Sequence, residues 1–426
     1  MIEVGFAGLN DGVGMQDRIA EIFYSRIQPK MNLLFDDIAD DKYLLSIDKL
    51  EIDCGVLSNK NWEDEWVDNT LRKLNEELVT KHRKSLAENT GINEEAEQMI
   101  LFFIENGHLP WNSSITTLNE LRELTERFTQ LSKLFESKLR SVFRANNELI
   151  KRCVVTFSET FIDKVISLFV NKDSEQWLFM ESFYREHSNI RRSLFDEAVL
   201  KTYCVAKEEN VLLRFFSHMY DLAEEMHKKE IEQVAVEKFH IKPGALKENK
   251  ASSDRKRKSN ADAIYLHNAG LVLLHPFLSH LFEMTGLTIK NQWKDDRSVS
   301  KAIKALHYLV NGDNEFAEFN YPLNKILCGL QPGDLIIDEE DLSIEIKTSC
   351  DGLLIETIGY WVQLKNTGID GFREAFLRRR GKLSVTSNGW LLQPEQKPID
   401  VLLTHLPWGI GIVKLPWMKE LLYTEW

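Results

Sequence analysis

Apolar residues recur every three or four positions through most of residues 58–235, which is the spacing of one face of an α-helix. The longest regular stripe runs from Leu118 to Val142, about 25 residues, and predicts a helix of about 40 Å. Shorter helical patterns cover residues 15–34, 58–90, 157–170, 175–187, 193–205 and 211–227. This periodicity predicts short helices packed against one another.

Strand signals occur near both ends of the chain. Residues 43–53 come close to apolar–polar alternation, which predicts a strand. Two short runs flank Asn388-Gly389, a dipeptide that favours a type I′ hairpin turn, and residues 401–406 and 410–415 are predicted as further strands. The predicted fold class is therefore α+β, mainly α, with stacked short helices and a C-terminal helical domain that ends in β-hairpin elements.

The second half of the chain contains further helical patterns. Residues 277–282 are predicted as a helix with Pro276 in its first turn, because proline is tolerated there. Residues 299–310, 353–364 and 371–380 are the other helices expected in this half.

One polar segment divides the chain. Residues 241–262 contain Lys-Pro-Gly and then Arg-Lys-Arg-Lys, with almost nothing apolar, which is typical of a flexible linker. The predicted organisation is a mixed α/β element (1–57), a helical region (58–240), a flexible basic linker (241–262) and a C-terminal domain (263–426). An anion-binding arm is the alternative interpretation of the basic cluster.

The composition excludes several classes of protein. Hydrophobic residues make up 43% and charged residues 28%, which is typical of a soluble globular protein. The net charge of -13 disfavours general nucleic-acid binding, because an acidic surface repels phosphates. We see neither a signal peptide nor an apolar run long enough for membrane insertion, and the five scattered cysteines are expected to be reduced thiols of a cytosolic protein. No cofactor or metal site is predicted.

One pattern could carry catalysis. Asp334 or Asp338, followed by Glu345 and Lys347, has the order of a PD-(D/E)xK nuclease, in which carboxylates hold a metal ion and lysine stabilises charge. Residues 343–347 alternate like a strand, but the acidic run just before them resembles the first turn of a helix. Because so short a pattern is common by chance, we predict no catalytic residues and keep the metal-dependent nuclease as the less favoured alternative.

The tripeptide Leu-Pro-Trp occurs three times, at residues 109–111, 406–408 and 415–417, whereas composition predicts on the order of 0.03 occurrences. Proline fixes φ, and the indole adds a large apolar face with one hydrogen-bond donor. Such a unit can anchor a chain to a core or contact a partner. We predict a structural anchor at Trp111 and leave both interpretations open for the other two. The candidate partner-binding residues are Trp390, Trp408, Trp417 and Trp426.

The C-terminal block carries an ordered series of motifs. They are HNAGLVLLHPFL (267–278), LHYL (306–309), LNKILCGL (323–330), Trp361 with LKNT (364–367), GFR (371–373), FLRRRG (376–381), LPWG (406–409) and LPWM (415–418). Near the N-terminus stand IDKLEIDCG (47–55) and GHLPW (107–111). In this order they resemble the contractile injection system tape measure protein family, while residues 115–260 match it only in helical character.

The resemblance implies a non-catalytic component of a bacterial phage-tail-like particle, in which a contractile sheath surrounds a tube on a baseplate. A tape measure lies in the tube lumen during assembly and sets the tube length. The implied partners are tube, hub or baseplate and assembly proteins. The implied location is the cytoplasm during assembly, with a place within the particle left open.

The ruler mechanism conflicts with the residue pattern. A single helix of all 426 residues would reach about 640 Å. The chain instead has proline and glycine interruptions and hairpin signals, and it lacks the sustained heptads of a long coiled coil. A folded assembly factor or adaptor that is not a length ruler is therefore the alternative function.

Overall fold

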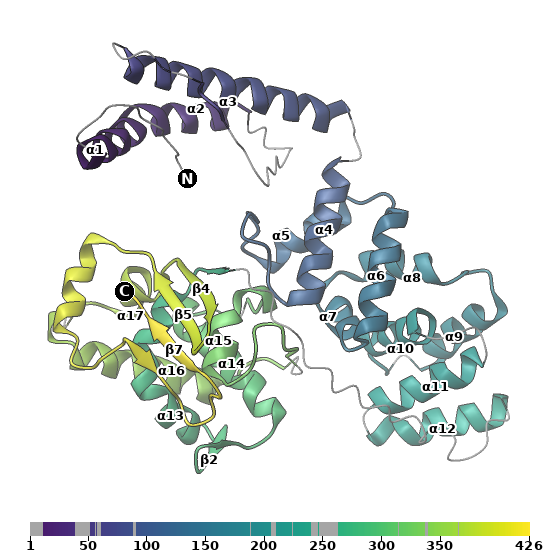
Figure 1. Cartoon of the computed structure of the whole chain (residues 1–426). Coiled ribbons are helices and arrows are strands. Elements are labelled where there is room, and N and C mark those ends of the chain that lie inside the picture. Colours follow the sequence, from purple (N-terminus) through teal and green to yellow (C-terminus); the bar gives the residue numbers. More distant parts are fainter. Residues whose placement is uncertain are drawn as a thin grey trace. The chain divides into compact units, whose positions relative to one another are not determined.

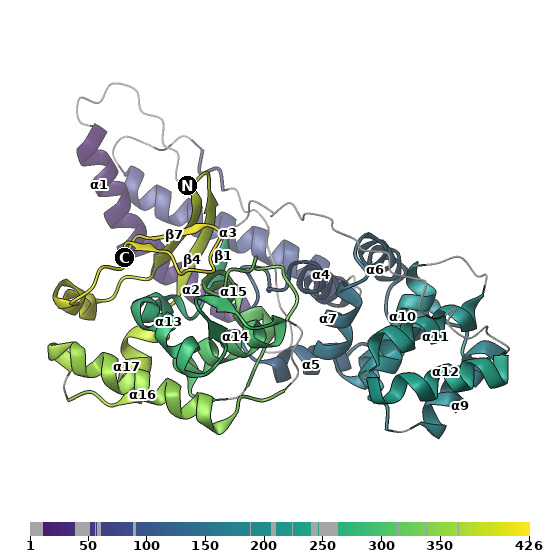
Figure 2. The same ribbon diagram turned by 90° about the horizontal axis from the view of Figure 1, so that it is seen from below.

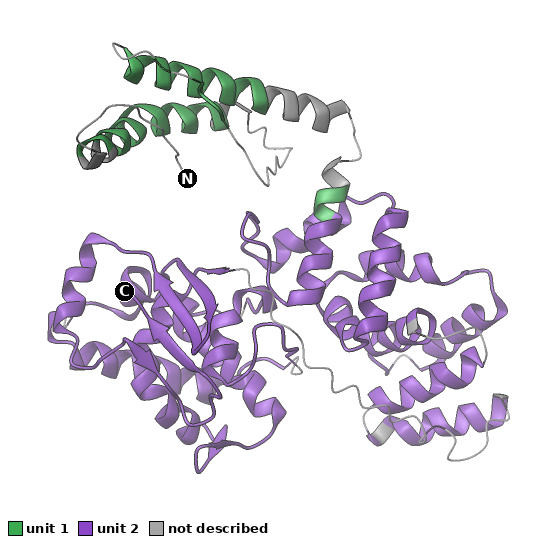
Figure 3. Ribbon diagram, in the orientation of Figure 1, with its two compact units in different colours: residues 1–96 green, residues 97–426 purple. Residues whose placement is uncertain are grey.

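The computed structural model describes residues 12–38, 52–55, 57, 61–87, 91–187, 189–205, 210–223, 225–239, 246, 263–313, 315–336, 340–364 and 366–426. The described part is mainly helical with a small sheet in its C-terminal third, which confirms the predicted α+β class (Figure 1). The chain divides into two compact units, residues 1–96 and 97–426 (Figure 3). The predicted boundaries at 57, 240 and 262 stay predictions, and of the predicted linker only Leu246 is described.

The first unit is built around three long helical segments. They are α1 (Gly12–Ile22), α2 (Gln28–Ile38) and α3 (Trp62–Ala87), and a π-helical turn, Phe23–Ile27, joins the first two. The helices predicted for residues 15–34 and 58–90 are confirmed. Ile22 and Ile27 form a small core with Trp66 and Val67 of α3. The strand predicted for residues 43–53 lies outside the described residues except for its last two, which belong to no regular element.

Among the described residues between 91 and 239, nine helices follow. They are α4 (Gly91–Asn106), α5 (Leu118–Glu126), α6 (Lys133–Ala145), α7 (Leu149–Thr156), α8 (Glu159–Phe169), α9 (Glu175–Glu186), α10 (Arg192–Val205), α11 (Val211–Leu222) and α12 (Glu225–Phe239). Serines begin three of them, because Ser132, Ser158 and Ser174 each accept a bond from the backbone N–H three residues later. We call α4 to α12 the helical arm. Helix α10 contacts α6, α7, α8 and α11, so it lies at the centre of this arm.

The prediction of one helix from Leu118 to Val142 is wrong, because the chain breaks between α5 and α6. The Ser132 hydroxyl accepts from Phe135 N at 3.0 Å, and Glu97 accepts from Ser132 N at 2.7 Å. Phe128 is buried in the break, and Lys164 donates to its carbonyl at 2.6 Å. A side-chain cap and two long-range contacts therefore replace the helical hydrogen bonds that the apolar period predicts.

The C-terminal block, residues 263–426, alternates short helices with strands. Its helical elements are η3 (Ala269–Leu274), α13 (His275–Met284), α14 (Asp296–Asn311), η4 (Glu318–Asn320), α15 (Pro322–Leu327), α16 (Ile344–Tyr360), η5 (Val362–Leu364), α17 (Ile369–Phe372), the π-helical η6 (Arg373–Leu377) and η7 (Pro398–His405). The predicted helix with Pro276 in its first turn is confirmed as α13. No described helix in either unit is long and apolar enough to cross a bilayer.

A mixed five-stranded sheet closes the block. Its strands are β1 (Ile264–Leu266), β4 (Gly381–Thr386), β5 (Gly389–Pro394), β6 (Ile412–Val413) and β7 (Leu421–Thr424), in the order β1-β4-β5-β7-β6. Only the β5–β7 pair is parallel. Helices α13 to α16 lie on one side of this sheet, where the main core is found (Figure 2).

Two of the predicted turns and strands need correction. The β4–β5 hairpin is confirmed, but Thr386 pairs with Gly389, so the loop residues are Ser387 and Asn388, and neither has positive φ. A type I′ turn occurs instead between β2 (Thr288–Ile289) and β3 (Gln292–Trp293), where Lys290 and Asn291 have φ of 51° and 61°.

The strand predicted at residues 401–406 is wrong, because residues 401–405 lie within the 3₁₀-helix η7 (Pro398–His405). Asp400 accepts from Lys397 N at 2.8 Å, which favours a helical turn after Pro398. Of residues 410–415, only Ile412 and Val413 form a strand, and they pair with β7. The predicted helices at 353–364 and 371–380 are displaced: α16 starts at Ile344, and residues 369–377 form α17 and η6.

Candidate functional site

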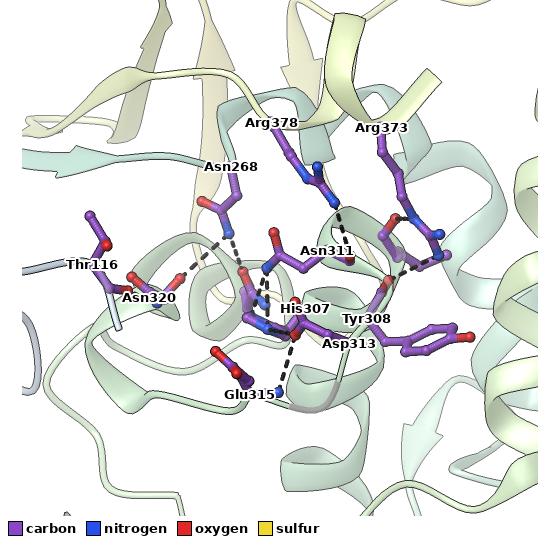
Figure 4. Close-up of polar contacts among 12 residues, drawn as sticks. Thr116, Asn268, His307, Tyr308, Asn311, Asp313, Glu315, Asn320, Arg373 and Arg378 are labelled. Carbon is purple, nitrogen blue, oxygen red and sulfur yellow. Dashed lines mark hydrogen bonds and ion pairs between the residues drawn. The ribbon is translucent and has the colours of Figure 1, made fainter. Parts of the chain in front are cut away.

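Two arginines bind the C-terminal end of α14 (Figure 4). Arg373 donates to the carbonyls of Leu309 at 3.1 Å and Tyr308 at 3.3 Å, and Arg378 donates to Asn311 O at 2.9 Å. The last carbonyls of a helix have no partner within the helix and carry its negative partial charge. The GFR and FLRRRG motifs therefore supply cations that stabilise the end of α14.

Arg373 is itself held in place. Its guanidinium pairs with Asp351 and Asp370, each at 3.2 Å, and lies 5.5 Å from the centre of the Tyr308 ring. Gly312 ends α14 with φ of 74°, and a Cβ there would stand 2.6 Å from Arg373 Nη1. Glycine is needed at this position both for its left-handed backbone and for the space that the arginine fills.

His307 lies on the buried side of the same helix end (Figure 4). Its Nε2 lies 3.2 Å from Asp313 Oδ1, and Asn311 Nδ2 lies 3.1 Å from its Nδ1. Burial lowers the pKa of His307, and Asp313 and Glu315 oppose this shift. The ring packs edge-on against Phe316 and Tyr321, so this histidine serves as a packed core residue with polar contacts.

Two asparagines connect β1 to α14 and α15. Asn268 Nδ2 donates to Asn324 Oδ1 at 2.8 Å, and Asn324 Nδ2 donates to Ile303 O at 3.1 Å. Asn324 is fully buried. The HNAG and LNKIL motifs, whose asparagines are 56 residues apart, therefore meet in one buried network with the carbonyl of Ile303 on α14.

A buried charge cluster joins the helical arm to the C-terminal block. Arg152 of α7 donates to both Glu318 oxygens, at 3.0 and 2.9 Å, and Lys325 of α15 pairs with Glu318 at 2.7 Å. Arg152 also donates to Ile104 O at 2.7 Å and Gly333 O at 2.8 Å. Arg152 and Lys325 are almost completely buried and the Glu318 side chain is 13% exposed, so most of the cluster is shielded from water.

The pKa shifts in this cluster follow from burial and charge. Burial lowers the pKa of Lys325 to about 8, against the opposing effect of Glu318. Burial alone would raise the pKa of Glu318, but Lys325 and Arg152 outweigh it and lower that pKa. We did not predict this cluster from the sequence. The available signal was the presence of Arg152 and Lys325 inside otherwise apolar helical stretches.

The predicted partner-binding tryptophans all pack against the C-terminal core. Trp390 is 4% exposed. The indole N–H groups of Trp408, Trp417 and Trp426 donate to Leu273 O, Leu327 O and Asp400 Oδ2, at 3.0, 2.8 and 3.0 Å. These three rings keep partly exposed faces, and their role in binding a partner stays a prediction.

Trp111 is not the structural anchor that we predicted from its motif. It is 67% exposed, so the predicted anchor to a core is wrong. The loop that carries it is nevertheless held at both ends. Gly107 N donates to Phe103 O at 2.7 Å, and Asn320 Nδ2 donates to Thr116 O at 3.2 Å. At this copy of Leu-Pro-Trp the indole therefore lies mostly in solvent.

The nuclease pattern does not have the geometry of that site. Ser343 caps α16, so Glu345 and Lys347 lie in the first turn of a helix and the strand suggested for residues 343–347 is wrong. Two positions apart on a helix, their side chains leave the axis about 200° apart. Asp334 accepts from Gln331 N at 2.7 Å, and Asp338 lies outside the described residues.

Among the described residues, no group of three or more His, Cys, Asp or Glu side chains is placed to hold a metal ion. Cys153, Cys204, Cys328 and Cys350 are free, buried thiols, as predicted, while Cys54 is half-buried. Several motif residues of the C-terminal block bond to other motifs inside the fold.

A family model for contractile injection system tape measure proteins matches residues 1–426. The chain therefore belongs to this family, whose members are structural components of contractile injection systems. No curated protein and no solved structure matches it.

Proposed function

We propose that this tape measure family protein acts as a folded docking component during assembly of the particle. In this proposal it binds tube, hub or baseplate, or assembly proteins in the cytoplasm, has no catalytic role, and does not set tube length by its own extended length.

Buried contacts between residues far apart in the sequence carry this proposal. Extending residues 97–426 into a rod would separate Arg152 from Glu318 and Asn268 from Asn324, which are 166 and 56 residues apart in the sequence. Charged and polar groups that are buried with partners stabilise one compact arrangement and are costly to separate. The longest described helix, α3, has 26 residues and is about 39 Å long, which is short for a ruler.

The proposal is tested with purified components. The chain is mixed with the tube, hub and baseplate proteins one at a time, and complexes are measured by sedimentation. We expect one of them to bind while amide hydrogen exchange shows that the C-terminal block stays protected. Absence of binding to all of them, or binding only with loss of this protection, contradicts the proposal.

Trp111→Ala is expected to weaken that complex at least 10-fold without changing stability. Exposed aromatic residues on a held loop lose little entropy on binding and are frequent anchors of interfaces. Because Trp111 is 67% exposed, its removal should change the free energy of unfolding by less than about 0.5 kcal/mol. Sedimentation and urea unfolding measure the two effects.

Leu178→Ala is the matched control, since Leu178 is 54% exposed on α9. It should leave both binding and stability unchanged. If the Trp111 and Leu178 variants bind equally well, Trp111 is not part of the interface.

A further inference from the structure

Helix α16 is apolar on both of its faces. Its inner face is buried in the C-terminal core and consists of Ile346, Cys350, Leu353, Leu354, Thr357 and Ile358. On its outer face, Ile344 is 77% exposed and Ile355 is 61% exposed. A surface helix normally has one apolar stripe and an opposite polar face, so α16 has a second apolar stripe that its own fold does not use.

The outer stripe has the shape of a helix-packing surface. With 100° between successive residues, Ile344, Thr348, Gly352, Ile355 and Gly359 fall within an arc of about 80° and extend over about 22 Å. No heavy atom lies within 4 Å of the position that a Cβ would take on Gly352 or Gly359. Glycine weakens a helix interior, and here it leaves a shallow depression in which another backbone can approach closely.

The location of α16 leaves this stripe accessible within its unit. Figure 2 shows the helix at the edge of the C-terminal block, on the side away from the sheet. Tyr360 and Val362, at the end of the helix and just after it, are also exposed, at 60% and 61%.

Negative charges beside the stripe favour a basic partner. Glu345 and Glu356 follow its edge, about 100° and 120° around the helix from Ile344, and both are exposed. A second copy of this chain carries a net charge of -13, which disfavours its approach to these carboxylates. A helix with lysine or arginine along its facing edge would pair with them.

We propose that the outer face of α16 is a docking surface for an amphipathic helix of another particle protein. The partner helix presents aliphatic side chains to Gly352, Ile355 and Gly359, and it places basic residues beside Glu345 and Glu356. This proposal rests on the proposed function, because it assumes that the chain binds other components of the particle while folded.

Photo-crosslinking from position 348 tests it directly. Thr348 is exposed in the middle of the stripe, and a benzophenone amino acid placed there reports what covers it. The full-length chain is crosslinked in cells that produce the particle, and the crosslinked peptide is sequenced by mass spectrometry. We expect an apolar helical segment of another particle protein with lysine or arginine at three- or four-residue spacing. A peptide of this chain itself, an acidic partner segment, or no crosslink overturns the proposal.

Two variants complete the test. Ile355→Glu and Gly352→Leu should each lower the crosslink yield at least 10-fold with no fall in Tm, because both positions are exposed. Leu178→Glu, on an equally exposed position of α9, should leave the yield unchanged. If both α16 variants still bind the purified particle protein as the wild type does, the α16 surface is refuted and the proposed function stands. If the wild type binds none of the purified proteins, both are refuted.

Discussion

Arg152→Ala is expected to lower the free energy of unfolding by about 3–5 kcal/mol. Arg152 is 1% exposed and donates to Glu318, Ile104 O and Gly333 O. Its removal leaves a buried carboxylate with only Lys325 as a charged partner and leaves two carbonyls without their donor. Urea unfolding followed by circular dichroism measures the loss.

Arg185→Ala is the matched control for this prediction. The Arg185 side chain is 73% exposed and pairs with Glu181 one helical turn away, a type of ion pair that contributes about 0.5 kcal/mol or less. Similar losses for the two variants would show that the Arg152 cluster does not hold the helical arm to the C-terminal block.

Gly270→Val should be at least as damaging, with an expected loss of about 3 kcal/mol or more. A Cβ on Gly270 would lie 1.8 Å from Phe376 O and 2.7 Å from Leu377 Cα. These neighbours are backbone atoms, so the clash cannot be relieved by a side-chain rotation, and the HNAG segment must separate from the FLRRRG segment.

Gly409→Ala distinguishes this clash from a general effect of glycine. No heavy atom lies within 4 Å of the position of its Cβ, and its φ is not in the left-handed region. We expect the Gly409 variant to be as stable as the wild type or slightly more stable. A Gly270 variant with wild-type Tm would contradict the close packing of these two segments.

The helices were largely predictable because their apolar period depends only on local sequence. The apolar period gave the wrong helix boundaries where a residue distant in the sequence makes a contact that interrupts the helix. Glu97, 35 residues from Ser132, accepts its backbone N–H and helps to fix the start of α6, so that the apolar pattern from Leu118 forms two helices. That contact could not be predicted from residues 118–142 alone.

The presence of the β4–β5 hairpin was predictable, but the position of its loop was not. Asn388-Gly389 correctly indicated the β4–β5 hairpin, but cross-strand pairing and the contact of Gly389 with Leu421 on β7 moved the loop by one residue. The type I′ turn at Lys290 and Asn291 was missed because its flanking strands have two residues each. Strands that short give no alternation to detect.

The candidate site shows the same limit. Identical Leu-Pro-Trp tripeptides have different roles: Trp408 and Trp417 donate to carbonyls of the core, whereas Trp111 is exposed. The partners of Arg152 are 48, 166 and 181 residues away, so its buried network could not be derived from local patterns. The order of the motifs indicated the family, whereas the contacts of each motif were visible only in the folded structure.

Tube length as a function of chain length tests the central claim most directly. A helical insertion of 42 residues is placed within residues 251–260, the polar run with Arg-Lys-Arg-Lys in the predicted linker. Tubes from producing cells are then measured by electron microscopy. A folded docking protein predicts tubes of wild-type length. An extended ruler predicts tubes longer by about 63 Å, and a shift of that size would contradict the account.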